Sequence, residues 1–291
     1  MSGDWIAVDW GSTNRRALRI DTDGAVADRL RDDRGVLALA GGDFAAEAAA
    51  IRARLGDLPM LCAGMVGSNR GWVDAGYVPA PAGLDALAAT LCWVEPGRTA
   101  IVPGVCRRAD GRADVMRGEE VLLLGAVAAG LVPADSLVVQ PGTHAKWATL
   151  AGGEISDFTT AMVGEMFALL GKGSLLADGL DLPAVDGAAF RAGVVRGAKG
   201  DLLAGLFGAR AALVLGQRDR IDQASYVSGL LIGNDAAVRL AGHQGVVHVL
   251  AEARLGGLYA AAIDALGHQA VVVDSTTAFV AGISAIWQRR A

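Results

Sequence analysis

The segment IAVDWGSTNRRALRI, residues 6–20, decides the fold that the sequence predicts. It begins with a short apolar run at residues 6–8. From residue 16 it alternates between polar and apolar side chains, as a half-buried strand does. Between these runs lies the turn DWGST, residues 9–13. The segment therefore predicts two strands joined by a glycine-containing turn.

The same plan occurs twice along the chain. In the second half, the turn PGTH at residues 141–144 follows an apolar strand in the same way. Both halves read strand, turn, strand, hairpin, strand, and then helix, strand, helix and strand, although their letters are not detectably alike. In the first half, after the strand at 16–20, the predicted elements are a hairpin turn at 21–24, a strand at 25–30, a helix at 43–55 with Asp43 as its N-cap and Gly56 just past its end, a strand at 60–63, a helix at 84–91 and a strand at 99–102. In the second half they are strands at 137–139 and 147–150, a hairpin turn at 152–153, a strand at 155–159, a largely helical region at 164–240, a strand at 246–250, a helix at 254–266, a strand at 271–273 and a helix at 277–288.

This doubled plan predicts an α/β protein with two domains that face each other across a cleft. Each domain would offer one glycine turn to that cleft, since small ligands tend to bind between domains. The polar, loop-like segment RRADGR at residues 107–112 is the expected boundary. The predicted domains are therefore residues 1–112 and 113–291.

The residue types of the first turn suit a phosphate group. Asp9 ends a buried strand and could hold Mg²⁺, an ion that takes few carboxylates and keeps several waters. Gly11 lets the backbone approach an anion without a Cβ in the way. The hydroxyls of Ser12 and Thr13, with nearby backbone N–H groups, can bind phosphate oxygens. The alternative is that these residues form only a capped tight turn.

The second turn strengthens the phosphate interpretation, because Gly142 and Thr143 occupy the equivalent place in the second half. Other phosphate and nucleophile motifs are absent. The chain has no G-x-G-x-x-G and no G-x-S-x-G sequence. We therefore predict that both glycine turns bind the phosphates of a nucleotide.

The segment MRGEE, residues 116–120, is a candidate for acid–base chemistry. Its two acids open an apolar run that predicts a helix to about Ala129, so they lie in the first turn of that helix. Acids there can simply complement the helix dipole. Alternatively, one carboxylate takes the proton from an attacking hydroxyl during phosphoryl transfer.

A glycine-rich segment, residues 64–72, follows the strand at 60–63. Ser68, Asn69 and Arg70 are suited to sugar hydroxyls and a carboxylate, and Trp72 could pack on a substrate. The alternative is a surface loop anchored by one tryptophan.

Composition limits the classes of partner. A formal net charge of −5 and only short, dispersed pairs of arginines argue against a nucleic-acid partner. No uncharged run reaches the roughly 18 to 20 residues that span a bilayer, and we expect no signal peptide. Three cysteines without a C-x-x-C pair are typical of a reducing compartment. We therefore expect a cytoplasmic protein that binds small molecules.

The chain resembles the 2-dehydro-3-deoxygalactonokinases, which belong to the sugar kinase/heat-shock/actin ATPase superfamily. The resemblance spans nearly the whole length, in family order. Its segments are AVDWGSTNRRA from Ala7, AGMVGSNRGW from Ala63, DVMRGEE from Asp114, PGTHAKW from Pro141, ISDFTTAMVGE from Ile155, SGLLIG from Ser228 and TTAFVAGISAI from Thr276.

The resemblance implies two ribonuclease-H-like domains that bind ATP and Mg²⁺ and phosphorylate 2-dehydro-3-deoxy-D-galactonate at its 6-hydroxyl. By position, residues 9–13 match the first phosphate motif and residues 142–143 the second. Glu119 falls where related sugar kinases carry a catalytic Asp after a glycine, and Glu120 remains an alternative base. The residues expected to face the substrate are Asn14, Arg16, Ser68, Asn69, Trp72 and His144.

Other readings stay open at this point. The same fold could serve a non-catalytic sensor of a sugar acid or a nucleotide, or a kinase for another hexose or sugar acid. The sequence also leaves open a homodimer. After the strand at 246–250, Glu252 stands where the family usually has a small turn that admits the adenosine, so nucleotide binding could differ here.

Overall fold

The predicted strand, turn and strand at the start of the chain are β1 (Trp5–Trp10) and β2 (Arg15–Ile20) of the computed structural model. The model describes residues 3–39, 41–108 and 111–290. These residues form two units, each described below by itself. Unit 1 comprises the described parts of 1–135, 150–158 and 275–291, and unit 2 comprises 136–149 and 159–274.

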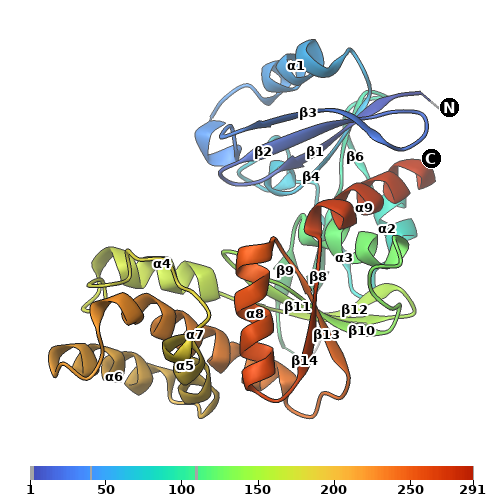
Figure 1. The fold of residues 1–291 in the computed structure, drawn as a ribbon. Coiled ribbons are helices and arrows are strands. Elements are labelled where there is room, and N and C mark those ends of the chain that lie inside the picture. Colours follow the sequence, from blue (N-terminus) through green and yellow to red (C-terminus); the bar gives the residue numbers. More distant parts are fainter. Residues whose placement is uncertain (1–2, 40, 109–110, 291) are drawn as a thin grey trace. The chain divides into compact units, whose positions relative to one another are not determined.

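Unit 1 is built on a six-stranded sheet in the order β3-β2-β1-β4-β7-β6 (Figure 1). β1 pairs antiparallel with β2 and parallel with β4, and β4 pairs parallel with β7. The other strands of this sheet are β3 (Val26–Asp32), β4 (Met60–Ala63), β6 (Cys92–Glu95) and β7 (Thr99–Ile101). The helices of unit 1 are α1 (Phe44–Leu55), α2 (Leu84–Ala89), α3 (Glu119–Ala128) and α9 (Ser275–Arg289), with short 3₁₀ turns η1 (Val36–Leu39) and η2 (Met65–Gly67).

A second sheet has the order β12-β11-β10-β13-β14. Its strands are β10 (Ser136–Gln140), β11 (Ala145–Ala151), β12 (Glu154–Ala161), β13 (Val246–Leu250) and β14 (Gln269–Val273). The helices of unit 2 are α4 (Val163–Gly173), α5 (Ala188–Ala198), α6 (Leu202–Val214), α7 (Arg220–Leu240) and α8 (Ala253–Ala265). The predicted helical region at 164–240 is therefore a group of four helices.

The two sheets repeat one plan, as the sequence predicts. We number the five predicted strands of each half 1 to 5 along the chain. In both sheets these strands then lie side by side in the order 3-2-1-4-5. The first and fourth strands of this count are parallel in both sheets, and so are the fourth and fifth. The first sheet has one additional edge strand, β6, which the sequence pattern did not predict.

The predicted beginning and end of helix α1 are confirmed. The Asp43 side chain accepts a hydrogen bond from the Ala46 backbone N–H at 3.0 Å, and Gly56 ends the helix. Phe44, Ile51 and Leu55 then bury one side of the helix in the core that β1 and β4 also line. The hairpin turn at 21–24 is also confirmed, with the Gly24 N–H bonded to the Asp21 carbonyl at 3.0 Å.

The division into units differs from the predicted boundary at 107–112. A small sheet of β5 (Tyr77–Pro79), β8 (Gly104–Arg107) and β9 (Asp114–Met116) brackets this segment. Arg107 pairs with Asp114 across the antiparallel strands β8 and β9, so the polar residues connect a hairpin inside unit 1. Residues 109–110 of the segment lie outside the described residues. The terminal helix α9 also belongs to unit 1, where it packs on α3.

Within the described residues, no helix is long and apolar enough to cross a membrane.

Candidate active site

The first glycine turn is held by backbone hydrogen bonds from a loop that follows β3. The Gly11 N–H closes the turn on the Asn14 carbonyl at 3.0 Å. Residues 35–37 then donate to the carbonyls of the turn: Gly35 to Thr13 at 3.2 Å, Val36 to Gly11 at 3.0 Å and Leu37 to Ser12 at 2.9 Å. These bonds fix the backbone of residues 11–13. The Thr13 and Asn14 side chains are exposed, and Asn14 Nδ2 donates to Thr13 Oγ1 at 3.1 Å.

Gly35 is a close-approach position that the sequence pattern did not reveal. A Cβ at this residue would overlap the Ser12 carbonyl and the Thr13 backbone, so only glycine allows the bracing loop to come this close. No local pattern signals this requirement, because the contact joins segments more than twenty residues apart.

Asp9 lies at the end of β1, directly opposite Arg16 on β2. Arg16 Nη2 contacts Asp9 Oδ2 at 3.2 Å, and Arg16 Nη1 donates to Thr276 Oγ1 at 3.1 Å. About a third of the Asp9 side chain, 36%, is exposed. The surrounding protein nevertheless desolvates this carboxyl enough to raise its pKa, against the attraction of Arg16, and Glu119 adds repulsion. Asp9 can therefore meet a ligand, and it has a charged neighbour on each side.

Three backbone segments converge beside Asp9. Gly64, which follows β4, has φ +96°, and a Cβ there would lie 2.9 Å from the Trp10 carbonyl oxygen. Gly118, which precedes α3, has φ +99°, and its Cβ would lie 3.0 Å from the Gly64 Cα. Both glycines allow close approach in a backbone conformation that L residues avoid. The start of α3 is thereby placed next to the first glycine turn.

The two acids at the start of α3 have different surroundings. Glu119 is half-buried, and its Oε2 accepts a hydrogen bond from the Arg117 backbone N–H at 2.9 Å. Glu120 is fully buried, and both of its oxygens accept from the Gly118 backbone N–H, at 2.7 and 2.8 Å. Burial, and secondarily the nearby charge of Glu119, raise the pKa of Glu120 to about 8. At neutral pH Glu120 therefore carries a proton, and Glu119 is the one that interacts electrostatically with Asp9.

The glycine-rich segment at 64–72 uses several of its side chains for its own structure. Ser68 is buried, and its Oγ donates to the Met65 carbonyl at 2.7 Å and accepts from the Arg70 N–H at 3.2 Å. Trp72 is half-buried and packs against the core of unit 1. Asn69 and Arg70 are exposed. The two exposed side chains are thus better placed to meet a ligand than Ser68 or Trp72.

The second glycine turn, in unit 2, is held by the start of α4. A Cβ at Gly164 would overlap the Gly142 carbonyl oxygen, and the Glu165 N–H donates to the Thr143 carbonyl at 2.9 Å. His144 lies 2.6 Å from Glu165, measured from Nε2 to Oε2. Gly164 is therefore a second close-approach glycine whose role the sequence pattern did not reveal.

A cavity of about 510 Å³ opens beside this second turn, within unit 2. Gly142 and Gly164 line it, together with apolar side chains of α4, α7 and α8 and with Arg254. Tyr259 also lines it, and the Tyr259 hydroxyl is buried without a hydrogen-bond partner among the described residues. Glu252, which the sequence placed near the nucleotide, is exposed at the residue before α8 and is not among the lining residues.

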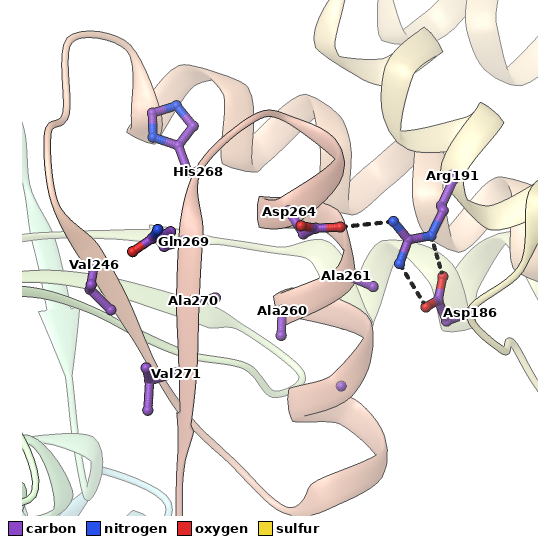
Figure 2. A pocket seen from close by; sticks show the side chains of 11 residues that line it. Asp186, Arg191, Val246, Ala260, Ala261, Asp264, His268, Gln269, Ala270 and Val271 are labelled. Atoms are coloured by element: carbon purple, nitrogen blue, oxygen red, sulfur yellow. Dashed lines mark hydrogen bonds and ion pairs between the residues drawn. The ribbon is translucent and has the colours of Figure 1, made fainter.

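Unit 2 has another hollow, of about 520 Å³, around β14 and α8. Figure 2 shows the side chains that line it. Arg191 points into this region between two carboxylates (Figure 2). It donates to both oxygens of Asp186 at 3.0 Å and to Asp264 at 2.9 Å. The arginine is thus already neutralised. None of the predicted site residues lines this hollow. The glycine turn of each unit therefore stays the candidate site within that unit.

Comparison with known proteins agrees with these features. The family described as 2-keto-3-deoxy-galactonokinase matches residues 9–286. A 2-dehydro-3-deoxygalactonokinase of Escherichia coli (strain K12) is 39% identical over 98% of both chains. A crystal structure of a Sinorhizobium meliloti protein, described as a candidate 2-dehydro-3-deoxygalactonokinase, has a TM-score of 0.89 at 34% identity over 98% of both chains.

More distant structures share the fold alone. The activator of the 2-hydroxyisocaproyl-CoA dehydratase from Clostridium difficile has a TM-score of 0.53 at 12% identity, over 98% of this chain and 95% of its own. The predicted fold class, that of the actin-like ATPases and sugar kinases, is confirmed. The family match covers nearly the whole chain and contains both glycine turns and the acidic pair. The chain belongs to the 2-keto-3-deoxy-galactonokinase family.

Proposed function

We propose that this chain transfers the terminal phosphoryl group of ATP to the 6-hydroxyl of 2-dehydro-3-deoxy-D-galactonate. Membership of the family and the name of the Escherichia coli relative support the sugar acid as acceptor. The arrangement of the residues supports the reaction type.

One observation carries the proposal: the first glycine turn and the start of α3 lie together in unit 1. Asp9 interacts electrostatically with Glu119, and the backbones of Trp10, Gly64 and Gly118 are in close contact. Phosphoryl transfer needs a carboxylate for the attacking hydroxyl and groups that balance the charge on the phosphate. Glu119 supplies the carboxylate, and the positive charge of Arg16, whose Nη2 lies 3.2 Å from Asp9 Oδ2, would balance charge on the phosphate.

In this mechanism Glu119 is the general base. Its carboxylate takes the proton from the 6-hydroxyl while the new O–P bond forms and the bond to the leaving ADP oxygen breaks. Glu120 does not compete, because it is buried and its pKa of about 8 keeps it protonated at neutral pH. Instead, Glu120 holds the Gly118 N–H and so orients the residue that follows it.

The phosphates of ATP would be bound by the two glycine turns. In unit 1 these are Gly11, Ser12 and Thr13. Their carbonyls are bonded to the bracing loop and the Gly11 N–H to the Asn14 carbonyl, so the hydroxyls and N–H groups of Ser12 and Thr13 would meet the ligand. In unit 2 they are Gly142 and Thr143. The cavity of about 510 Å³ beside Gly142 would take the nucleoside, with apolar walls for the base and Arg254 at its edge.

Magnesium fits the carboxylate of Asp9. Among the described residues, no three His, Cys, Asp or Glu side chains come together as a metal cage. Mg²⁺ does not need one, because it commonly binds one or two carboxylates and keeps waters and substrate phosphates as its other ligands. Asp9 would hold the ion, which would neutralise charge on the phosphates.

The sugar acid would be bound by the remaining predicted residues. Asn69 is exposed and has amide groups that suit hydroxyls, and Arg16 and Asn14 flank the first turn. Ser68 and Trp72 would shape the loop from within, and His144 stays a proposed contact in unit 2. The partners that we propose are thus two small molecules in the cytoplasm.

Measurement of ATP consumption tests the proposal. Purified protein with Mg-ATP is supplied with 2-dehydro-3-deoxygalactonate, its epimers, other keto-deoxy acids and plain hexoses in parallel. We expect turnover with 2-dehydro-3-deoxygalactonate and a 6-phosphate as product by NMR. Absence of turnover on every keto-deoxy acid, with tight binding retained, would instead support a sensor on the same fold.

A further inference from the structure

The helix α6 has an outward face that no part of its unit covers. Gly205, Leu206 and Ala209 are buried on its inner side, where Leu206 and Ala209 join a core cluster with residues of α7. The opposite side carries only apolar or small residues over three turns. These residues are Leu203, Ala204, Phe207, Gly208, Ala211, Val214 and, just after the helix, Leu215.

The large side chains of this face are strongly exposed. Leu203 is 80% exposed, Phe207 66%, Val214 64% and Leu215 69%. Scattered exposed apolar residues are normal on a protein surface, but a contiguous uncharged stripe usually marks an interaction site. The only charged residue within α6, Arg210, lies at the flank of the face and is half-buried. A soluble protein therefore gains by covering this face.

The face is complementary to itself. At helical spacing, Leu203, Phe207 and Val214 form one row of large side chains, and Ala204, Gly208 and Ala211 form a parallel row of small ones. A Cβ at Gly208 would meet nothing within 4 Å, so the protein's own packing does not require glycine there. A second α6, running parallel to the first and related to it by a two-fold axis along their length, would place its large row over this small row. We infer that α6 pairs with α6 of a second copy of this chain, around a two-fold axis.

The area available agrees with a reversible dimer. The exposed apolar side chains of the face would bury on the order of 600 Å² per copy, against about 800 Å² per partner in a standard interface. Two-fold pairing is the commonest symmetry for such a self-complementary patch. The association should therefore depend on protein concentration.

A membrane surface is the less suitable occupant. Helices that lie on membranes carry several Lys or Arg residues on their polar side, whereas α6 has Arg210 alone. The chain also has a formal net charge of −5, which does not favour an anionic surface.

Sedimentation velocity over a hundredfold range of protein concentration tests the dimer. We expect a monomer–dimer equilibrium for the wild type. Phe207→Glu places a charge on the large row, and Gly208→Leu fills the small row without a clash inside the protein. Each should raise the dissociation constant at least tenfold. The matched control is Val238→Glu, a substitution of similar exposure (62%) on α7, which should leave the equilibrium unchanged.

We expect all three variants to fold, because the three sites are exposed. Circular dichroism checks this. A wild type that stays monomeric throughout the range overturns the inference. So does a dimer that persists in both α6 variants. Binding of the monomer to phosphatidylcholine vesicles, abolished by Phe207→Glu, would assign the face to a membrane and would equally overturn it.

Discussion

The two glycine turns share a backbone plan but differ in what surrounds them. Each follows the first strand of its sheet, and each is braced by a glycine that comes too close for any Cβ, Gly35 for the first turn and Gly164 for the second. The first turn has the carboxylates of Asp9 and Glu119 beside it. The second has no such pair in its cavity lining but borders a mostly apolar cavity of about 510 Å³.

This difference indicates how a repeated fold divides the work of a kinase. The plan presents a glycine turn at the same place in each sheet, because the strand order is the same, and we propose that both turns bind phosphate. The neighbouring elements then decide the chemistry. In unit 1 the start of α3 brings acids, whereas in unit 2 the helices α4, α7 and α8 line a cavity of about 510 Å³, which we propose for the nucleoside. The proposed function predicts that substitutions at the two turns change different kinetic constants.

Replacing Glu119 with Gln should give the largest effect. Without a carboxylate to take the proton of the hydroxyl, kcat should fall about 10²–10⁴-fold while ATP binding is kept. The measurements are steady-state kinetics and ATP binding by calorimetry. Glu120→Gln is the matched control, and it should keep most of the turnover, because a protonated carboxyl at neutral pH is close to an amide. If Glu120→Gln is instead the inactive variant, the base is Glu120.

Replacing Gly35 or Gly164, the glycine that packs on each turn, with Ala should change different kinetic constants. Gly35→Ala displaces the carbonyl of Ser12 next to the acids, so we expect kcat to fall about tenfold or more, since misplacement of about 1 Å is costly in catalysis. Gly164→Ala displaces the carbonyl of Gly142 beside the cavity, so we expect mainly a higher KM for ATP. Gly173→Ala at the other end of α4 meets no atom within 4 Å and should change neither constant. Identical kinetic changes in Gly35→Ala and Gly164→Ala would contradict the division of roles.

Much of the fold could be predicted, because its signals are local. The cap at Asp43, the hairpin at 21–24 and the succession of strands along both halves of the chain follow from neighbouring residues. The small sheet could not be predicted, since its strands have three or four residues and show no alternation. Its hairpin also explains why the polar segment at 107–112 resembles a domain boundary.

The candidate site was predicted by residue type, and less well by detail. Asp9 and the acidic pair were proposed from their residue types, and their role stays a prediction. The interaction between Asp9 and Glu119 was not foreseeable from positions 110 residues apart. Gly35 and Gly164 could not be identified, because their role lies in contacts with distant backbone. The sequence also could not separate Glu119 from Glu120, since both stand in the first turn of one helix. Burial and the backbone at Gly118 make that distinction.

A pH-dependent effect on stability would sharpen the contrast within the acidic pair. The pKa of Glu120 rises from 4.5 to about 8 on folding, mainly through burial. Between these two values the folded protein binds a proton that the unfolded chain has lost. The free energy of unfolding therefore decreases as pH rises through this window, and the contribution is lost above about pH 8. Glu120→Gln cannot titrate, so its stability relative to the wild type should improve from pH 5 to about pH 8 and then stay constant. Urea unfolding of both proteins at several pH values gives this difference, in which the contributions of histidines and of Asp9 cancel. A difference that is independent of pH would mean that Glu120 is ionised in the folded protein, and it would then compete with Glu119 for the role of base.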